Sequence, residues 1–220
     1  EPPPRIHKPG VKRISLALQG GGSHGAFTWG VMHRLISEPR IYIDGLSGTS
    51  AGGMNAAVFA DGFLKGKRQG AIDALQAFWM GVSALNPIPR AIPRGIPGVS
   101  EGWDVDKDPT FMWLDFTTRL FAPRQVNPMR LDPLGDLLAD LVDFENLRNH
   151  PEVKLFVTAS NVRTCRSRTF RTPEMSVKAL MASACLPLMF EAVEVDGEFY
   201  WDGGYLGNPA IHPLIHECDS

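Results

Sequence analysis

The first 60 residues alternate between strand and helix patterns, with glycines at the changes. Apolar residues stand at every second position over 14–19, which is typical of a strand, and helical periodicity follows over about 26–36. A second β-rich run over 41–48 leads into small residues over 51–60, which suit a closely packed helix. This order favours a parallel sheet, and we expect a three-layer αβα fold with a mainly parallel central sheet.

The remaining elements are read in the same way. Helical spacing recurs over 70–85 and 133–148, a strand pattern covers 153–160, and a short apolar helix is expected over 177–185. Two short strands flank Asp196-Gly197, a strong signal for a two-residue hairpin. We expect a linker over 1–12, one domain over 13–220 and, because of its prolines and aromatics, a lid or pocket-bordering insertion over 86–122.

Composition excludes several classes. With 44% hydrophobic and 21% charged residues, the chain is typical of a folded globular protein. A net charge of −2 gives no field to attract nucleic acid. The three cysteines, Cys165, Cys185 and Cys218, have neither a metal-ligand spacing nor the even number of a disulfide framework. We therefore expect reduced thiols and neither a nucleic acid partner nor a metal.

Targeting signals are not apparent. No run approaches the roughly 18 apolar residues that span a bilayer, and the opening Glu-Pro-Pro-Pro-Arg lacks the apolar core of a secretory signal. From these missing signals and the unpaired cysteines we expect a cytoplasmic location.

The first chemical motif is Gly48-Thr49-Ser50-Ala51-Gly52, at an expected strand-to-helix turn. A serine on such a turn projects its hydroxyl into the open, and the two glycines remove side chains that would clash. The N-terminus of the new helix favours negative charge developing nearby. The alternative is a small-residue turn with a capping serine.

The second motif is a glycine loop between the first strand and its helix, with Gly20, Gly21, Gly22 and Gly25 around Ser23 and His24. Consecutive glycines allow backbone N–H groups to face a common point, as an oxyanion hole requires. The same residues satisfy the G-x-G-x-x-G pattern, with Asp44 at a suitable spacing to bind a ribose. A dinucleotide site is thus the competing interpretation.

The third motif, Asp202-Gly203-Gly204, directly follows the second hairpin strand. Taken alone it is typical of a turn. In a hydrolase, however, it supplies the missing base, since the glycines allow the carboxylate to turn back toward the edge of the sheet. A dinucleotide-binding domain has no need of the serine turn, whereas the hydrolase interpretation uses all three motifs.

Together these motifs resemble the patatin-like phospholipase family, and Ala182-Ser183-Ala184-Cys185-Leu186-Pro187 is similar to a further segment of that family. The resemblance covers most of residues 13–210. It implies Ser50 as nucleophile, Asp202 as general base, and Gly20, Gly21 and Gly22 as oxyanion donors, supported by Gly25, Gly48, Gly52, Gly203 and Gly204. It further implies hydrolysis of lipid or other acyl esters without a cofactor, with transient contact to a membrane surface.

Two departures accompany the resemblance. Family members usually carry arginine or lysine late in the glycine loop, where this chain has His24, so a contact with lipid phosphate would depend on pH or be lost. The family domain commonly continues beyond the aspartate motif, and we expect this chain to lack that continuation.

Three alternatives stay open. A Ser-His-Asp esterase would use His212, which follows Ser50 and Asp202 in the chain order of α/β-hydrolases. A dinucleotide-binding domain would be indifferent to loss of Ser50. A non-catalytic lipid-binding module would associate with lipid without turnover.

Overall fold

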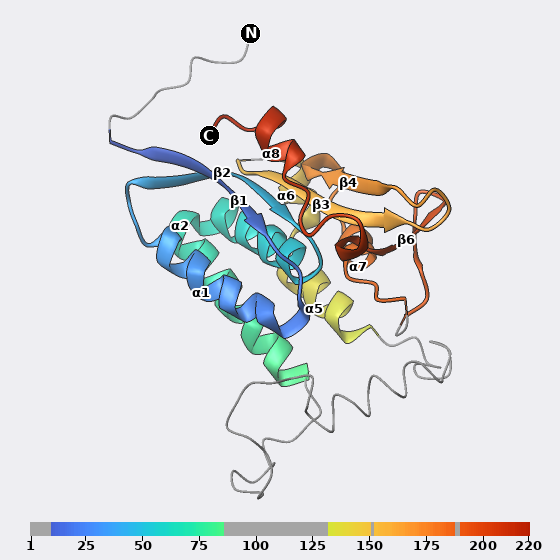
Figure 1. Cartoon of the computed structure of the whole chain (residues 1–220). Coiled ribbons are helices and arrows are strands. Elements are labelled where there is room, and N and C mark those ends of the chain that lie inside the picture. The colour runs from blue at the N-terminus through green and yellow to red at the C-terminus, as the bar shows by residue number, and fades with distance from the viewer. Residues whose placement is uncertain (1–9, 86–131, 151, 188–189) are drawn as a thin grey trace, which may run out of the picture.

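A mixed β-sheet with helices on both faces forms the protein (Figure 1). The computed structural model describes residues 10–85, 132–150, 152–187 and 190–220. The expected lid over 86–122 lies outside these residues, as does nearly all of the expected linker over 1–12, since β1 begins at Lys12. Both stay predictions.

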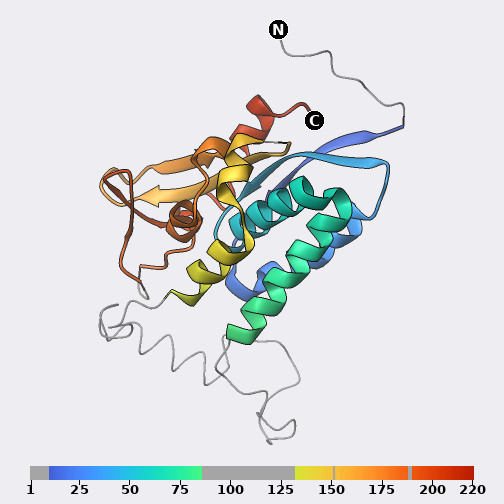
Figure 2. The ribbon, with the colours of Figure 1, turned by 180° about the vertical axis from the view of Figure 1, so that it is seen from behind.

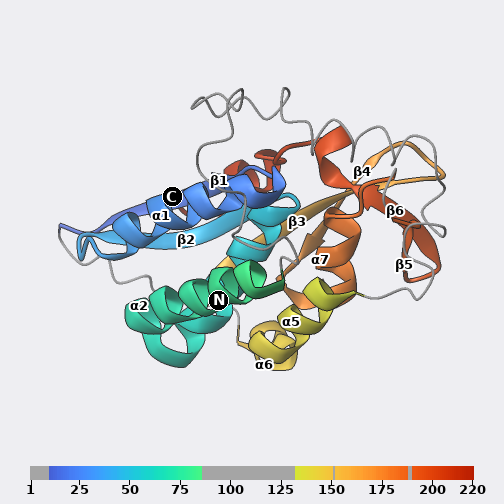
Figure 3. The same ribbon diagram turned by 90° about the horizontal axis from the view of Figure 1, so that it is seen from below.

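One face of the sheet carries most of the described helices. Figure 3 looks onto this face, where α1, α2, α5, α6 and α7 lie, while α8 packs against β2 on the other face. This confirms the expected three-layer α/β architecture. The helices are α1 (Gly25–Ile36), α2 (Ala51–Leu85), α5 (Pro133–Leu141), α6 (Phe144–Asn149), α7 (Val177–Ser183) and α8 (His212–Glu217).

The sheet has a parallel and an antiparallel part. β1, β2 and β3 pair in parallel, whereas β4 and β6 pair antiparallel to β3, and β5 pairs antiparallel to β6. The strands are β1 (Lys12–Leu18), β2 (Ile41–Gly48), β3 (Lys154–Asn161), β4 (Ser167–Arg171), β5 (Val193–Val195) and β6 (Glu198–Asp202). Asp196 (φ 52°) and Gly197 (φ 79°) form the expected hairpin turn between β5 and β6.

The pairing along β3 brings distant motifs together. β4 occupies one edge of β3 over Phe156–Ser160, so β2 and β6, which overlap that stretch, must share the other edge. β2 ends at Gly48 beside Val157, and β6 ends at Asp202 beside Ala159. Because β2 and β6 run in opposite directions, their carboxyl ends face each other across about 7 Å of β3.

The long helix α2 consists of two straight halves. Gly66 and Lys67 have non-helical backbone angles, and Figure 2 shows the two halves running in different directions. Every residue of the first half from Ala51 to Gly62 is buried, which confirms the close packing expected from its small residues. The second half returns toward α5, so Phe78, Trp79 and Val82 reach the same cavity as the start of the helix.

One strand and one α-helix were not expected from the sequence. β4 lies where the chain reads as polar, Ser-Arg-Thr-Phe-Arg, with only Phe170 fully buried. α8 has six residues and exposes Ile211 and Ile215 beside its start and within it. Neither shows a clear period, because the first is an edge strand and the second is a short surface helix.

Candidate active site

Ser50 occupies the sharp turn that its motif predicts. β2 ends at Gly48, α2 begins at Ala51, and Ser50 between them has a left-handed backbone angle (φ 54°). A non-glycine residue in this conformation costs on the order of 1–3 kcal/mol, and such strain concentrates at functional sites. The turn holds Ser50 half-exposed at the carboxyl end of the sheet.

Gly52 is needed because the chain packs tightly behind the serine. A Cβ on Gly52 would lie 2.1 Å from the carbonyl oxygen of Leu18, at the end of β1. A Cβ on Gly48 would lie 2.5 Å from the carbonyl group of Gly52. These glycines let α2 begin directly against β1, which brings Ser50 beside the glycine loop.

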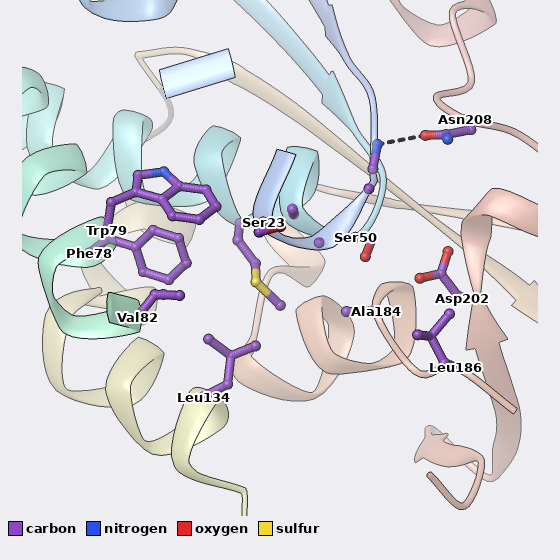
Figure 4. Close-up of a pocket in the computed structure, with 15 residues that line it drawn as sticks. Ser23, Ser50, Phe78, Trp79, Val82, Leu134, Ala184, Leu186, Asp202 and Asn208 are labelled. Carbon is purple, nitrogen blue, oxygen red and sulfur yellow. Dashed lines mark hydrogen bonds between the residues drawn. The ribbon is translucent and has the colours of Figure 1, made fainter. Parts of the chain in front are cut away.

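Asp202 is buried opposite Ser50, with 6% of its surface exposed. Burial raises the pKa of its carboxyl group, whereas the hydrogen bond from the Gly204 N–H and the neighbouring Ser50 side chain lower it. The Gly204 N–H donates to Oδ1 of Asp202 at 2.7 Å. Figure 4 shows the carboxylate directed toward the Ser50 hydroxyl.

The glycine loop lies against the serine. A Cβ on Gly20 would lie 2.9 Å from Cβ of Ser50, so only glycine fits there. Gly21 (φ 149°) and Gly22 (φ 57°) have backbone angles that side chains disfavour. The Gly20 N–H donates to Oδ1 of Asn208 at 2.6 Å. Among the described residues the N–H groups of Gly21 and Gly22 have no hydrogen-bond partner.

A segment after the aspartate motif ties these parts together. The Thr49 hydroxyl donates to the Gly207 carbonyl at 2.8 Å, and the Ser47 hydroxyl donates to that of Ala210. Asn208 lies between these contacts and accepts from Gly20. Asn208 had no assigned role in the sequence, and its place six residues after Asp202 was the only available signal.

Ser183 on α7 supports the serine turn through two hydrogen bonds. Its hydroxyl accepts from the Ser50 N–H at 2.8 Å and donates to the Thr158 carbonyl at 2.6 Å. Ser183 is fully buried. Sequence reasoning noted the segment around it, but not this contact, which joins residues 133 positions apart.

A largely apolar cavity of about 590 Å³ opens between these residues (Figure 4). Gly20, Gly21, Gly22, Ser50 and Asp202 line one end of it. The apolar wall consists of Ala51, Met54, Phe78, Trp79, Val82, Leu134, Ala184 and Leu186. The cavity thus combines polar groups at one end with the apolar surface that an acyl chain requires.

The residues of the alternative interpretations lie elsewhere. His212 is exposed on α8, where its ring lies tilted against that of His216 with centroids 4.2 Å apart, and it is not part of the described cavity wall. Asp44 is buried within β2, four residues before its carboxyl end, and accepts a hydrogen bond from the Asp219 N–H. It is therefore badly placed for a ribose bound at the glycine loop.

Other polar residues near the strand ends have structural partners. His24 is exposed, and its Nδ1 forms a hydrogen bond with the Gly21 carbonyl at 3.0 Å. Arg163 forms an ion pair with Glu198, which also accepts a hydrogen bond from Asn161. Asn161 and Arg163 thus hold the end of β3 to β6.

The cysteine nearest the site is unsuited to nucleophilic attack. Cys185 is buried, its thiol donates to the Glu191 carbonyl at 3.0 Å, and its own carbonyl accepts from the Asp202 N–H at 2.8 Å. Burial raises the pKa of this thiol to about 11, and the nearby Asp202 contributes. The thiol therefore stays protonated at neutral pH.

Within the described ranges, no group of three or more His, Cys, Asp or Glu residues could hold a metal ion. None of the helices described there is long and apolar enough to cross a membrane.

The fold and the site define an α/β protein in which a strand–serine–helix turn, a glycine loop and a buried aspartate surround an apolar cavity. A family model described as patatin-like phospholipase matches residues 16–215. The chain belongs to the patatin-like phospholipase family, as its motifs predict.

Other comparisons add little. No curated protein matches the chain in sequence. Among solved structures, the crystal structure of VipD from Legionella pneumophila is similar, with a TM-score of 0.49 and 17% identity over 90% of this chain. The match covers 46% of that chain, so the present sequence spans about half the length of that protein.

Proposed function

We propose that the protein hydrolyses acyl esters of lipids, with Ser50 as nucleophile and Asp202 as general base. The observation that carries this proposal is that the buried Asp202 carboxylate is directed toward the Ser50 hydroxyl at the polar end of an apolar cavity (Figure 4). Family membership supports the same class of reaction.

In the first step, Ser50 Oγ attacks the ester carbonyl carbon while its proton passes to the Asp202 carboxylate. The tetrahedral intermediate collapses by breaking the bond to the alcohol oxygen, which takes the proton from Asp202. In the second step Asp202 accepts a proton from water as the water oxygen attacks the acyl-enzyme. The fatty acid leaves, and the proton returns to Ser50 Oγ.

The developing oxyanion needs donors that are not already engaged. Gly21 and Gly22 meet this condition among the described residues, whereas the Gly20 N–H donates to Asn208. The Ala51 N–H begins α2 and belongs to the first turn, whose N–H groups lack partners inside a helix. We therefore assign the oxyanion to Gly21, Gly22 and Ala51, and give Gly20 the role of fitting the loop against Ser50.

A fluorophosphonate, which reacts with activated serines, tests the proposal directly. Intact mass and peptide mapping should show one adduct on Ser50, absent in Ser50→Ala. Asp202→Asn should lose ester turnover, whereas His212→Ala should keep it. Wild-type turnover in Asp202→Asn would refute the proposed base, and loss of activity in folded His212→Ala would favour the triad.

Two outcomes would favour the other classes. Association with liposomes by folded protein that neither labels nor hydrolyses esters would indicate a lipid-binding module. Affinity for a dinucleotide that survives Ser50→Ala would indicate that the glycine loop serves nucleotide binding.

A further inference from the structure

The apolar cavity has a direction. In Figure 4, Ser50 and Asp202 lie at one end, and Phe78, Trp79 and Val82 lie at the other. An acyl chain esterified at Ser50 would thus run along the apolar wall toward the aromatic end. The volume of about 590 Å³ is within the range of pockets that hold small ligands.

A buried hydrogen-bond chain fixes Trp79 at the far end. The indole Nε1–H donates to Oδ1 of Asn55 at 2.8 Å, and Nδ2 of Asn55 donates to the Gly25 carbonyl at 3.0 Å. Asn55 is fully buried, and 8% of Trp79 is exposed. Moving the indole would leave buried polar groups of Trp79 and Asn55 without partners, which is costly.

Packing restrains the same ring from two further sides. A Cβ on Gly25 would lie 2.8 Å from Cζ2 of Trp79, so the indole touches the backbone at the start of α1. The Phe78 ring packs edge-on against it, with centroids 5.3 Å apart and planes at 73°. Trp79 therefore forms a stiff wall, unlike a flexible side chain such as Met54.

We propose that Trp79, held by Asn55, sets the longest acyl chain that the site accepts. This inference rests on the proposed function. Among the described residues, a chain that reaches the indole meets a ring that hydrogen bonds and packing hold in place. Up to that limit each added methylene contributes about a fourfold gain in apparent affinity, and beyond it the gain stops or reverses. Val82, one helical turn after Trp79, borders the same end.

The test is a chain-length series of p-nitrophenyl esters, from butyrate to stearate, read as kcat/KM. Trp79→Leu and Val82→Ala should move the optimum to longer chains, by about fourfold for each methylene newly accommodated. Val82→Phe should move it to shorter chains. Trp29→Leu is the matched control, because Trp29 is a half-buried tryptophan of α1 outside the described cavity wall, and its profile should equal that of the wild type.

An unchanged optimum in Trp79→Leu, Val82→Ala and Val82→Phe would overturn the inference. If Trp79→Leu does not fold, the two Val82 variants provide the test, because Val82→Ala should lengthen the optimal chain and Val82→Phe should shorten it. Displacement of a fluorescent fatty acid from the Ser50→Ala protein, with and without the Val82 substitutions, measures the same limit without turnover. If the protein hydrolyses no ester at all, the proposed function is contradicted. If it binds fatty acids but the Val82 variants leave the longest accepted chain unchanged, the role of the aromatic end is contradicted.

Discussion

The backbone N–H of Gly20 donates a 2.6 Å hydrogen bond to Oδ1 of Asn208, although the two residues are 188 positions apart. This contact joins the glycine loop to the segment that follows Asp202. It also directs the Gly20 N–H toward Asn208, which leaves Gly21 and Gly22 as the free donors of the described loop.

Asn208→Ala should therefore slow the chemical step. Losing one hydrogen bond that positions the loop should cost about 0.5–1.5 kcal/mol, a fall of up to about tenfold in kcat with KM little changed. The rate of fluorophosphonate labelling should fall in parallel. Asn161→Ala, an asparagine that contacts Glu198 outside the described cavity wall, is the control. Equal rates in wild type and Asn208→Ala would show that the loop holds its shape without this contact.

Ser183→Ala should destabilise the fold. It removes the acceptor of the Ser50 N–H and the donor to the Thr158 carbonyl, both within the buried support of the turn. We expect a loss of about 1–3 kcal/mol in the free energy of unfolding, measured in urea. The exposed Ser167 provides a control, since Ser167→Ala should change stability by less than about 0.5 kcal/mol. A Ser183→Ala protein as stable as the control would contradict the supporting role.

A pair of glycine substitutions should have opposite effects. Gly52→Ala places a Cβ 2.1 Å from a carbonyl oxygen of β1, which forces backbone apart, so thermal unfolding should shift to much lower temperature. Gly30 is an exposed position of α1, and a Cβ there would have no atom within 4 Å. Gly30→Ala should therefore raise the free energy of unfolding by about 0.5–1 kcal/mol through helix propensity. A Gly52→Ala protein with wild-type stability would mean that the turn is not packed against β1 as described.

The pH dependence of activity should report Asp202. Because burial raises its pKa above the ordinary value of 3.8, the carboxylate becomes protonated, and unable to accept the Ser50 proton, at a higher pH than usual. The acid limb of kcat/KM should therefore lie above pH 3.8. A limb at or below that value would contradict the assignment of a buried base.

Deprotonation of Asp202, which activity requires, should lower the stability of the fold. A raised folded-state pKa means that the charged form is disfavoured by folding, so the stability that Asp202 contributes falls as pH rises through that pKa. Asp202→Asn should then be more stable than the wild type in urea at neutral pH. The difference should shrink as pH falls toward the ordinary value of 3.8. A variant less stable at neutral pH would indicate that the contacts of the carboxylate with Gly204 and Ser50 outweigh its burial.

Local pattern was sufficient for most elements. The alternation over 14–19, the helical periods over 26–36 and 70–85, and the Asp196-Gly197 turn all appear in the structure, because each depends on neighbours within one or two turns. β4 and α8 were not predicted because their residues are mostly exposed and show no apolar period. The sequence also did not predict that β2 and β6 share one edge of β3, since strand order is not a local property.

The sequence alone determined the three chemical motifs and the family. The glycine at position 48, an uncommon backbone angle at Ser50 and the turn after Asp202 are local requirements that only a few residue types meet. Tertiary structure decided which residues meet: Asp202 faces Ser50 because β6 and β2 pair with the same edge of β3, Asn208 accepts from Gly20, and Trp79 lies at the end of the cavity. These contacts join positions far apart in the chain, so they exist only once the strands have paired and α2 has turned back on itself.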